Sequence, residues 1–432
     1  MAIISPFAGL RFNPEKTKDL SRAISPPYDK ITAAERAELW KRSERNVVRL
    51  ILPPPGDKEI DTVTQSTDAE SLDWYASAAR LYQEWRKENI LQTDLAQLYV
   101  YKQTFSYRGN AYNRTGLFGA LQLGEQSGPR SHEYTFEGPK ADRLRLLRAA
   151  KANLSPIFLI ADGGRAEWDS IFSLAGERLI HFHDLDGQEH LLEGISGEKE
   201  LRTAEEFLQR RELVIADGHH RYETAMNYCR EMKEKTGKDP RREAWGSLLV
   251  LIVPIADPGL LVLPTHRVLS NMPNGWFDRL REKAAPDFDI EPIRQVSGEA
   301  LRSALAGRNR SIAVLSRQDA AMFTLKSHAA PASMDAIPAS LRDLNVAILH
   351  RHFFAACLDL PEEALREAVR YVRDEEEAAD RVRQGASDAA FLLAGISPQT
   401  VFDVSLTGVR MPQKSTDFYP KIPTGLVLRS VE

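Results

Sequence analysis

The chain has 432 residues, of which 57 are Lys or Arg and 61 are Asp or Glu, so its formal net charge is −4 at pH 7. A chain of this length usually forms more than one hydrophobic core, and we expect two or three domains. Because charges of both signs are mixed along the chain, the composition argues against a general nucleic-acid-binding protein, which needs a concentrated basic face.

The cysteines and the apolar segments bear on the cellular compartment. Cys229 and Cys357 lack the CxxC spacing of zinc and redox sites, and reduced thiols in the cytoplasm are the default. The first residues lack the basic region and apolar core of a signal peptide. No apolar run approaches the roughly 20 residues that span a bilayer. We therefore expect a soluble, cytoplasmic protein without a membrane partner.

The N-terminal part of the chain is predicted to begin with an extended, proline-rich segment that ends at Tyr28 and Asp29. Hydrophobic periodicity and turn residues then predict a series of helices and strands. In order, these are a helix from Thr32 with Glu35 as its capping-box partner, a helix over 71–88, a hairpin of 97–107 and 114–123 around Arg108-Gly109-Asn110, a helix over 140–154, and a buried strand over 156–160.

The remainder of the chain continues this alternation of strands and helices. The predicted elements are a hairpin of 178–184 and 189–192, a helix over 199–210, a strand over 214–216, a helix that ends near Gly237, an apolar strand over 248–255, strands over 311–315, 322–325 and 389–393, and a helix over 341–357. Such a mixture predicts a mixed α/β fold, which can also be described as α+β.

The most informative motif is Asp217-Gly218-His219-His220-Arg221, where a short apolar run ends and a helix begins. Backbone N–H groups and the positive end of the helix dipole favour an anion there, and Arg221 strengthens the preference, so we predict a phosphate site. Asp217 could orient a hydroxyl or hold a metal, while Gly218 permits close approach of a ligand. Adjacent histidines point in different directions, so one is expected to face the ligand and the other to pack. A helix cap with solvent-exposed histidines is the alternative.

A second cluster comprises His132 and Glu133, followed by Lys140, Asp142 and Arg143. Glu133 lies just before a predicted helix in a segment that is otherwise rich in cations. Those cations would keep the carboxylate ionised, as a general base or a metal ligand requires. A salt-bridged loop explains the same spacing equally well.

A third cluster, His266 and Arg267, follows an apolar strand, where charged residues need a partner. These residues either pair with an acid or bind a ligand. A fourth cluster, Lys414-Ser415-Thr416 with Lys421, lies in a donor-rich C-terminal loop and could clamp a phosphate or an oxyanion.

Several common nucleotide-binding and hydrolase motifs do not occur in the sequence. There is no GxxxxGK[ST] loop, no GxGxxG after a strand, no HExxH and no GxSxG. A phosphate site in this chain would therefore have to be built on a helix start of another kind.

The run Asp217–Tyr222 resembles the phosphate-binding motif of the ParB/sulfiredoxin superfamily, and especially that of free-serine kinases with a ParB-like fold. In those kinases a Pro-His-Glu segment supplies the catalytic glutamate and precedes a helix, a strand that begins Pro-Ile, and the DGHHR motif. Here His132-Glu133, the helix at 140–154, Pro156-Ile157 and the DGHHR motif occur in the same order. Two features differ, because Ser131 stands where the kinases carry proline and residues 161–213 separate the Pro-Ile strand from the motif.

The whole chain resembles a family catalogued as domain of unknown function 1015. The matching segments are 26–29, 138–143, 152–158, 217–223, 263–267 and 411–421. Together the two resemblances imply a ParB/sulfiredoxin-like nucleotide-binding core over 96–270, with an inserted hairpin near 163–212. An N-terminal α/β segment over 1–95 and a C-terminal α/β domain over 271–432 would flank it.

These features predict a nucleotide-dependent phosphotransferase that uses ATP, ADP or CTP with Mg²⁺ and acts on a small hydroxyl compound such as a serine-like metabolite. Glu133 would accept the hydroxyl proton, while Gly218–Arg221 hold the transferred phosphoryl group. His220 is a further catalytic candidate, and Asp217 together with Glu133 could bind the Mg²⁺. The additional phosphate contacts would come from His266, Arg267, Lys414, Ser415 and Thr416.

Two other functions remain open at this point. The first is a ParB-like, nucleotide-dependent switch without strong DNA binding, since no basic helix-turn-helix is evident. The second is a metal-dependent phosphohydrolase. DNA is not expected as a partner, a small-molecule substrate is, and a homodimer is compatible with the sequence.

Overall fold

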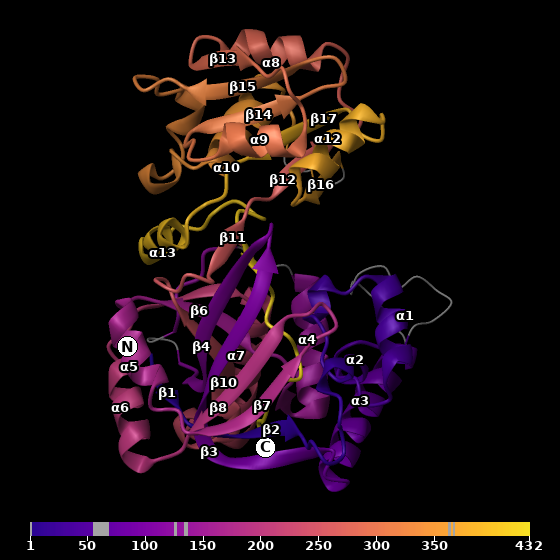
Figure 1. The fold of residues 1–432 in the computed structure, drawn as a ribbon, viewed down its shortest axis with the longest axis vertical. Coiled ribbons are helices and arrows are strands. Elements are labelled where there is room, and N and C mark those ends of the chain that lie inside the picture. The colour runs from indigo at the N-terminus through magenta and orange to yellow at the C-terminus, as the bar shows by residue number, and fades with distance from the viewer. Residues whose placement is uncertain (1, 55–68, 125–127, 134–136, 362–363, 366–367) are drawn as a thin grey trace. The chain divides into compact units, whose positions relative to one another are not determined.

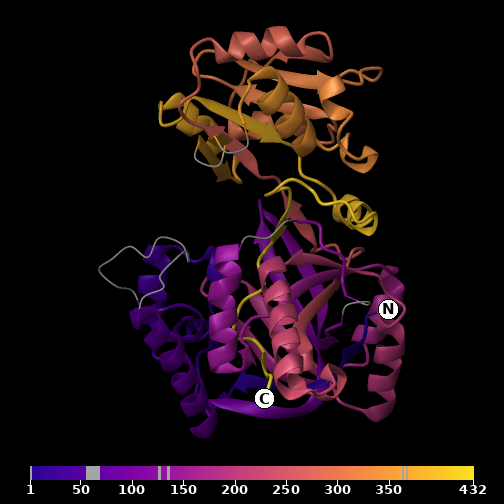
Figure 2. The same cartoon turned by 180° about the vertical axis from the view of Figure 1, so that it is seen from behind.

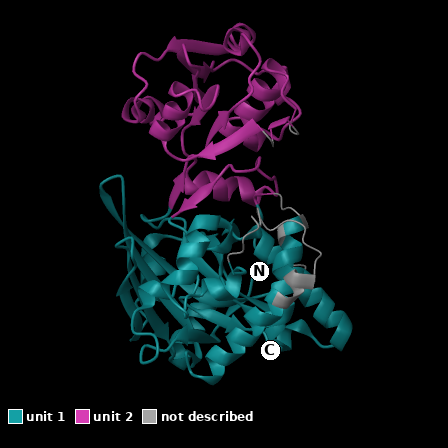
Figure 3. Cartoon of the chain, turned by 90° about the vertical axis from the view of Figure 1, so that its right-hand side faces the viewer, with its two compact units in different colours: residues 1–131, 135–260, 420–432 teal, residues 132–134, 261–419 magenta. Residues whose placement is uncertain are grey.

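The computed structural model describes residues 2–54, 69–124, 128–133, 137–361, 364–365 and 368–432. The chain divides into two compact units (Figure 3). Unit 1 comprises residues 1–131, 135–260 and 420–432, and unit 2 comprises residues 132–134 and 261–419. The mixed α/β class is confirmed. The expected division into segments 1–95, 96–270 and 271–432 stays a prediction.

A curled sheet forms the centre of unit 1 (Figure 1). Its strands follow the order β5-β19-β2-β3-β4-β10-β6-β9, with β1 paired to β4 and the β7–β8 hairpin paired to β3. The strands are β1 (Ile4–Ser5), β2 (Phe7–Phe12), β3 (Leu91–Tyr107), β4 (Asn110–Gln122), β5 (Ala152–Asn153), β6 (Ile157–Ala161), β7 (Glu177–His183), β8 (Glu189–Ile195), β9 (Leu213–Asp217), β10 (Ser247–Pro254) and β19 (Leu428–Ser430). Strands β6 and β10 pair in parallel, and their side chains are almost completely buried. A strand buried on both faces explains their continuous apolar sequences.

Two groups of helices cover this sheet. Helices α5 and α6 lie on one side of unit 1 and α1, α2 and α3 on the other, as Figures 1 and 2 show from opposite directions. The helices of unit 1 are α1 (Ala33–Arg42), α2 (Val48–Ile51), α3 (Ala69–Lys87), α4 (Glu137–Ala150), α5 (Arg165–Phe172), α6 (Glu198–Leu208) and α7 (His219–Thr236). Each group has its own apolar core, and α4 packs against both α3 and α7.

Local sequence signals determine where several of these elements begin and end. The Thr32 hydroxyl accepts from the Glu35 N–H, and the Glu35 carboxylate accepts from the Thr32 N–H at 2.8 Å, so the predicted capping box is confirmed. Helix α7 ends at Gly237, which has a φ of +68°. The β3–β4 hairpin turns at Arg108 and Gly109, which both have positive φ, as a tight two-residue turn demands.

Unit 2 is built on a six-stranded antiparallel sheet with the order β13-β15-β14-β17-β12-β16 and on a separate β11–β18 pair. The strands are β11 (Leu261–Leu263), β12 (His266–Leu269), β13 (Phe288–Pro292), β14 (Ser311–Leu315), β15 (Ala320–Leu325), β16 (Val369–Val372), β17 (Ala389–Leu393) and β18 (Asp417–Tyr419). The α-helices with described bounds are α8 (Trp276–Ala284), α9 (Gly298–Leu305), α10 (Asn345–Ile348), α12 (Glu375–Arg383) and α13 (Pro398–Leu406).

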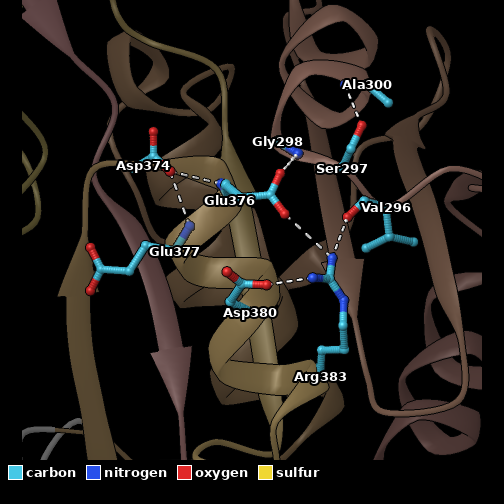
Figure 4. A network of polar contacts seen from close by, with 9 residues as sticks. All are labelled: Val296, Ser297, Gly298, Ala300, Asp374, Glu376, Glu377, Asp380 and Arg383. Carbon is cyan, nitrogen blue, oxygen red and sulfur yellow. Dashed lines mark hydrogen bonds and ion pairs between the residues drawn. The ribbon is translucent and has the colours of Figure 1, made fainter.

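A polar network joins α9 to α12 (Figure 4). Asp374 caps α12 by accepting from the N–H groups of Glu376 and Glu377 at 2.9 and 3.0 Å. The Glu376 carboxylate in turn accepts from the N–H of Gly298, at the start of α9, and from Arg383. These contacts satisfy N–H groups at both helix starts, so they fix the two helices to each other.

The predicted helix over 341–357 differs from the observed one. Its α-helical part covers only α10, and residues Leu349–Cys357 continue as a π-helix, in which the Leu358 N–H donates to the carbonyl of Phe353 at 2.9 Å. The wider turn of a π-helix shifts the side chains away from the 3.6-residue period. Within this segment His352 stacks on Phe288, with ring centroids 5.1 Å apart. Apolar periodicity alone cannot distinguish this geometry from an α-helix.

Candidate functional site

The motif around Gly218 connects the buried strand β9 to helix α7 in unit 1. Gly218 adopts a φ of +94° and is the N-cap of α7, where it offers no side chain to cap the first turn. No acidic residue occurs in that first turn. The positive end of the α7 dipole is therefore not offset by a neighbouring carboxylate of the helix itself.

Asp217, the last residue of β9, is held by two cations. Lys421 donates to Oδ1 at 3.2 Å and Arg221 donates to Oδ2 at 3.0 Å. Arg221 also donates to the carbonyl of Pro156. Burial disfavours the charged carboxylate, but Lys421, Arg221 and the charge of Lys30 outweigh this effect and hold the pKa of Asp217 well below its usual range. Asp217 is therefore a carboxylate at neutral pH.

Further cationic groups lie close to the start of α7. The guanidinium of Arg143 stacks on the ring of Tyr28 at 4.2 Å. Burial raises the pKa of Tyr28 to about 12, although the charges of Arg143 and Arg221 oppose this rise. Lys30 is near enough to act on Asp217. Several cations from separate segments therefore surround one end of α7.

A small pocket of about 60 Å³ opens beside the first turns of α7. Arg143, Arg221 and Tyr28 contribute polar groups to its lining, and Leu146 and Leu154 contribute apolar ones. A buried water occupies on the order of 10–15 Å³ on this measure, so the pocket has room for a few waters or for one small polar group. Two guanidinium groups line it, and each also donates to a backbone carbonyl, that of Arg143 to Ile51 and that of Arg221 to Pro156.

The remaining unit 1 candidates fasten helices together. Lys140 pairs with Glu223 of α7 at 3.1 Å. Asp142 accepts from the hydroxyl of Tyr75 at 2.7 Å and pairs with its neighbour Arg143, which also donates to the carbonyl of Ile51 at 2.8 Å. His219 is buried and His220 is half-buried at the start of α7.

Residues from three of the predicted clusters meet within unit 2. His132 is fully buried, and its Nε2 lies 2.9 Å from the Thr416 hydroxyl. Arg267 is 1% exposed and donates to the carbonyls of Gln413 and Lys414 at 3.2 and 2.9 Å. Burial lowers the pKa of Arg267 to about 10, while the charges of Tyr371 and Glu133 oppose the change. Glu133 therefore lies within electrostatic reach of Arg267.

The other unit 2 candidates differ in exposure. His266 is fully buried in β12, where its Nδ1 accepts from the Leu393 N–H at 3.2 Å and its Nε2 lies 3.8 Å from Glu375. Ser415 is buried and donates to the carbonyl of Pro412. Lys414 is exposed. Of the two interpretations of His266, a pair with an acid and a ligand contact, both stay predictions.

Some residues of the unit 1 site were not predicted as a group. Lys30 follows the rigid Pro-Pro-Tyr-Asp segment. Lys421 ends the donor-rich C-terminal loop, where the sequence placed it in the fourth cluster and not beside Asp217. Each is basic and each follows a proline-containing segment, which is a weak signal. Only the tertiary structure brings them to Asp217, which is separated from Lys421 by 204 positions.

The geometry does not favour Asp217 as a metal ligand, because both of its oxygens already contact cations. Within the described residues, no group of three or more His, Cys, Asp and Glu side chains is arranged to hold a metal ion. Likewise, none of the described helices combines the length and the apolar character needed to cross a bilayer.

Replacing Gly218 by Ala tests the local geometry. The new Cβ would lie 2.9 Å from Ile157 Cγ2 and 3.0 Å from Arg221 Nη2, and the φ of +94° disfavours any L-residue. We expect unit 1 to lose about 1–2 kcal/mol of unfolding free energy, measured by urea denaturation. Gly109→Ala is the matched control, because Gly109 also has a positive φ but its Cβ would meet nothing within 4 Å. Equal losses in both variants would show that only backbone strain matters at Gly218.

The chain matches one family model over most of its length. The family model described as "Protein of unknown function (DUF1015)" matches residues 4–347. No curated protein sequence matches the chain.

Solved structures with a similar arrangement include a conserved hypothetical protein from Pyrococcus furiosus, with 14% identity, 68% of this chain and 89% of that chain covered, and a TM-score of 0.33. A free serine kinase in complex with AMP is 11% identical, with 67% of this chain and 83% of the kinase chain covered and a TM-score of 0.34. SbnI with a C-terminal truncation, from Staphylococcus aureus, shows 10% identity, 71% and 85% coverage, and a TM-score of 0.33. All three are distant resemblances.

Proposed function

The chain belongs to the DUF1015 family of proteins of unknown function, and from the residues of its site we propose that it binds a nucleotide at the start of α7 and transfers a phosphoryl group to a small hydroxyl compound. The nucleotide is ATP, ADP or CTP in this proposal. A ParB/sulfiredoxin-like core also belongs to the proposal, because the order of motifs along the sequence suggests it.

The charge around Gly218 carries the phosphate part of the proposal. Arg143, Arg221, Lys30 and Lys421 gather near the start of α7, and two of them already neutralise Asp217. A helix start without a capping side chain or an acidic first turn attracts anions, and nearby guanidinium groups bind phosphate oxygens in a bidentate manner. A phosphate group is the ligand that best fits these donors.

In the chemical step, the hydroxyl oxygen of the acceptor attacks the terminal phosphorus of the nucleotide. A new O–P bond forms, the bond to the bridging oxygen breaks, and the shortened nucleotide leaves with that electron pair. Glu133 is proposed to take the proton of the attacking hydroxyl. Gly218–Arg221 are proposed to stabilise the charge on the transferred group. When bound, Mg²⁺ would neutralise charge on the phosphates, and Glu133 fits it better than Asp217, both of whose oxygens already contact cations.

A thermal-shift panel with ATP, ADP, CTP, GTP and pyrophosphate, each with and without Mg²⁺, tests the binding part. We expect a nucleotide to stabilise the protein by about 2.7 kcal/mol at 100 times its Kd. Lys421→Met should weaken binding about tenfold or more, because a hydrogen bond to a charged group contributes about 1.5–3 kcal/mol. Lys235→Met is the matched control, since Lys235 lies in the last turn of α7, at the opposite end from Gly218, and is largely exposed.

The outcomes of the panel separate the three candidate functions. Nucleotide turnover that accelerates on adding L-serine or another small hydroxyl compound supports the phosphotransferase. Nucleotide-dependent retention on DNA without turnover would instead support the switch. Stabilisation by metal alone, together with release of phosphate from a phosphorylated metabolite, would support a phosphohydrolase. An equal loss of binding in the Lys421 and Lys235 variants would exclude the α7 start as the phosphate site.

A further inference from the structure

We infer that Arg267 is a positioning residue, which holds Glu133 in place through the loop 411–416 instead of binding the nucleotide itself. This inference rests on the proposed function, in which Glu133 is the general base. It differs from both roles expected for Arg267 from the sequence, which were a pair with an acid and direct contact with a ligand.

Both terminal nitrogens of Arg267 donate within unit 2, while its buried Nε has no hydrogen-bond partner among the described residues. Its guanidinium donates to the carbonyl of Thr265 and to those of Gln413 and Lys414, and it stacks on the ring of Tyr371 at 5.3 Å. The side chain is almost completely buried. With its terminal nitrogens bonded to three carbonyl groups and its face on an aromatic ring, the guanidinium of Arg267 fastens main chain. Arg267 therefore joins strand β12 to the loop 411–416.

The loop in turn holds the segment that carries Glu133. The Met411 N–H donates to the carbonyl of His132 at 2.8 Å, and the Thr416 hydroxyl lies 2.9 Å from His132 Nε2. His132 is fully buried, with its ring 6.5 Å from that of Phe418. His132 and Glu133 belong to unit 2, although the next segment of unit 2 begins only at Leu261. These contacts make the short segment part of unit 2.

The backbone of the loop supplies independent support. Lys414 adopts a φ of +56°, a left-handed conformation that costs a non-glycine residue about 1–2 kcal/mol. Such strain persists only where surrounding contacts impose it. The carbonyl of Lys414 is the one that Arg267 holds at 2.9 Å. The hydrogen bond from Arg267 can therefore maintain the strained conformation of the loop. The loop in turn fixes the position of Glu133.

Positioning of this kind acts on the rate of the chemical step. A misplacement of about 1 Å at a reacting group can lower a rate by about 10²-fold. We expect Arg267→Met to lower kcat by about 10- to 100-fold and to leave KM for the nucleotide nearly unchanged. Arg267→Lys should recover part of kcat, because its ammonium keeps the charge and can reach one carbonyl. Hydrogen exchange of the full-length protein should show faster exchange at residues 132–133 and 411–416 in Arg267→Met.

A second variant tests the same connection with less risk to folding. Thr416→Val preserves the shape of the side chain and removes the hydroxyl that contacts His132, so kcat should fall in the same direction. Thr407→Val is the control, because the Thr407 hydroxyl donates to the carbonyl of Val404 and accepts from the N–H of Val409, both at the end of α13 and away from His132. An increase in nucleotide KM that parallels the loss of kcat in Arg267→Met would show direct binding and overturn the inference. Unchanged exchange and unchanged kcat in both Arg267→Lys and Thr416→Val would also overturn it.

Failure of the proposed function has a different signature. If wild type shows no phosphoryl transfer, or if Glu133→Gln leaves transfer intact, Glu133 is not the base. The exchange experiment does not depend on activity, so it still decides whether Arg267 holds the loop and the segment at 132–133.

Discussion

Glu133→Gln is expected to lower the rate of phosphoryl transfer by about 10²- to 10⁴-fold, which is the usual contribution of a general base. Glutamine keeps the shape of the side chain but cannot accept the proton of the attacking hydroxyl. Because the loss concerns the transition state, kcat and kcat/KM should fall together. Single-turnover assays with radiolabelled nucleotide would measure the rate, and calorimetry would measure nucleotide binding.

Glu223→Gln provides the matched control for this experiment. Glu223 is partly buried, as Glu133 is. It pairs with Lys140 at 3.1 Å, and the proposal gives it no role in proton transfer. Its substitution should leave kcat close to that of wild type. If Glu133→Gln weakened nucleotide binding as much as it slowed transfer, Glu133 would be a binding residue and the assignment as base would fail.

Signals between neighbouring residues predicted the local structure well. The capping box of Thr32 and Glu35, the end of α7 at Gly237 and the turn at Gly109 depend on residues within four positions of each other. Their geometry follows from backbone hydrogen bonding and from the freedom of glycine, and both are visible in a sequence. The boundary between β9 and α7 at Gly218 was predictable for the same reason.

The contacts that build the candidate site were not predictable, because they join segments that are distant in sequence. Lys421 reaches Asp217 across 204 positions and His132 meets Thr416 across 284. The burial of Arg267 and the π-helical turns after Ile348 likewise depend on tertiary packing. Sequence patterns identified most of the residues, while their partners, and therefore the role of Arg267, required the structure.

Asp217→Asn is expected to destabilise unit 1 by about 2 kcal/mol at pH 7. Removing one partner of a buried ion pair costs about 3–5 kcal/mol, and partial exposure of Asp217, at 21% of its side chain, reduces the effect. Lys421 and Arg221 would then face each other without the carboxylate between them. Denaturation followed by tryptophan fluorescence would report mainly on unit 1, because five of the six tryptophans lie in its residue ranges.

The pH dependence distinguishes charge from packing in this variant. The folded-state pKa of Asp217 is lowered, so its stabilisation is complete above the unfolded pKa of about 3.9 and is lost as pH falls through the folded pKa. The difference between wild type and Asp217→Asn should therefore be largest near pH 7 and shrink steadily below about pH 4. Asp239→Asn, which breaks an exposed pair with Arg241, should change the free energy of unfolding much less than Asp217→Asn does at any pH. If the difference in unfolding free energy between the two proteins stayed constant down to pH 3, Asp217 would stabilise unit 1 through packing and not through its charge. The cations around α7 would then lack the anionic partner that keeps them together before a phosphate binds.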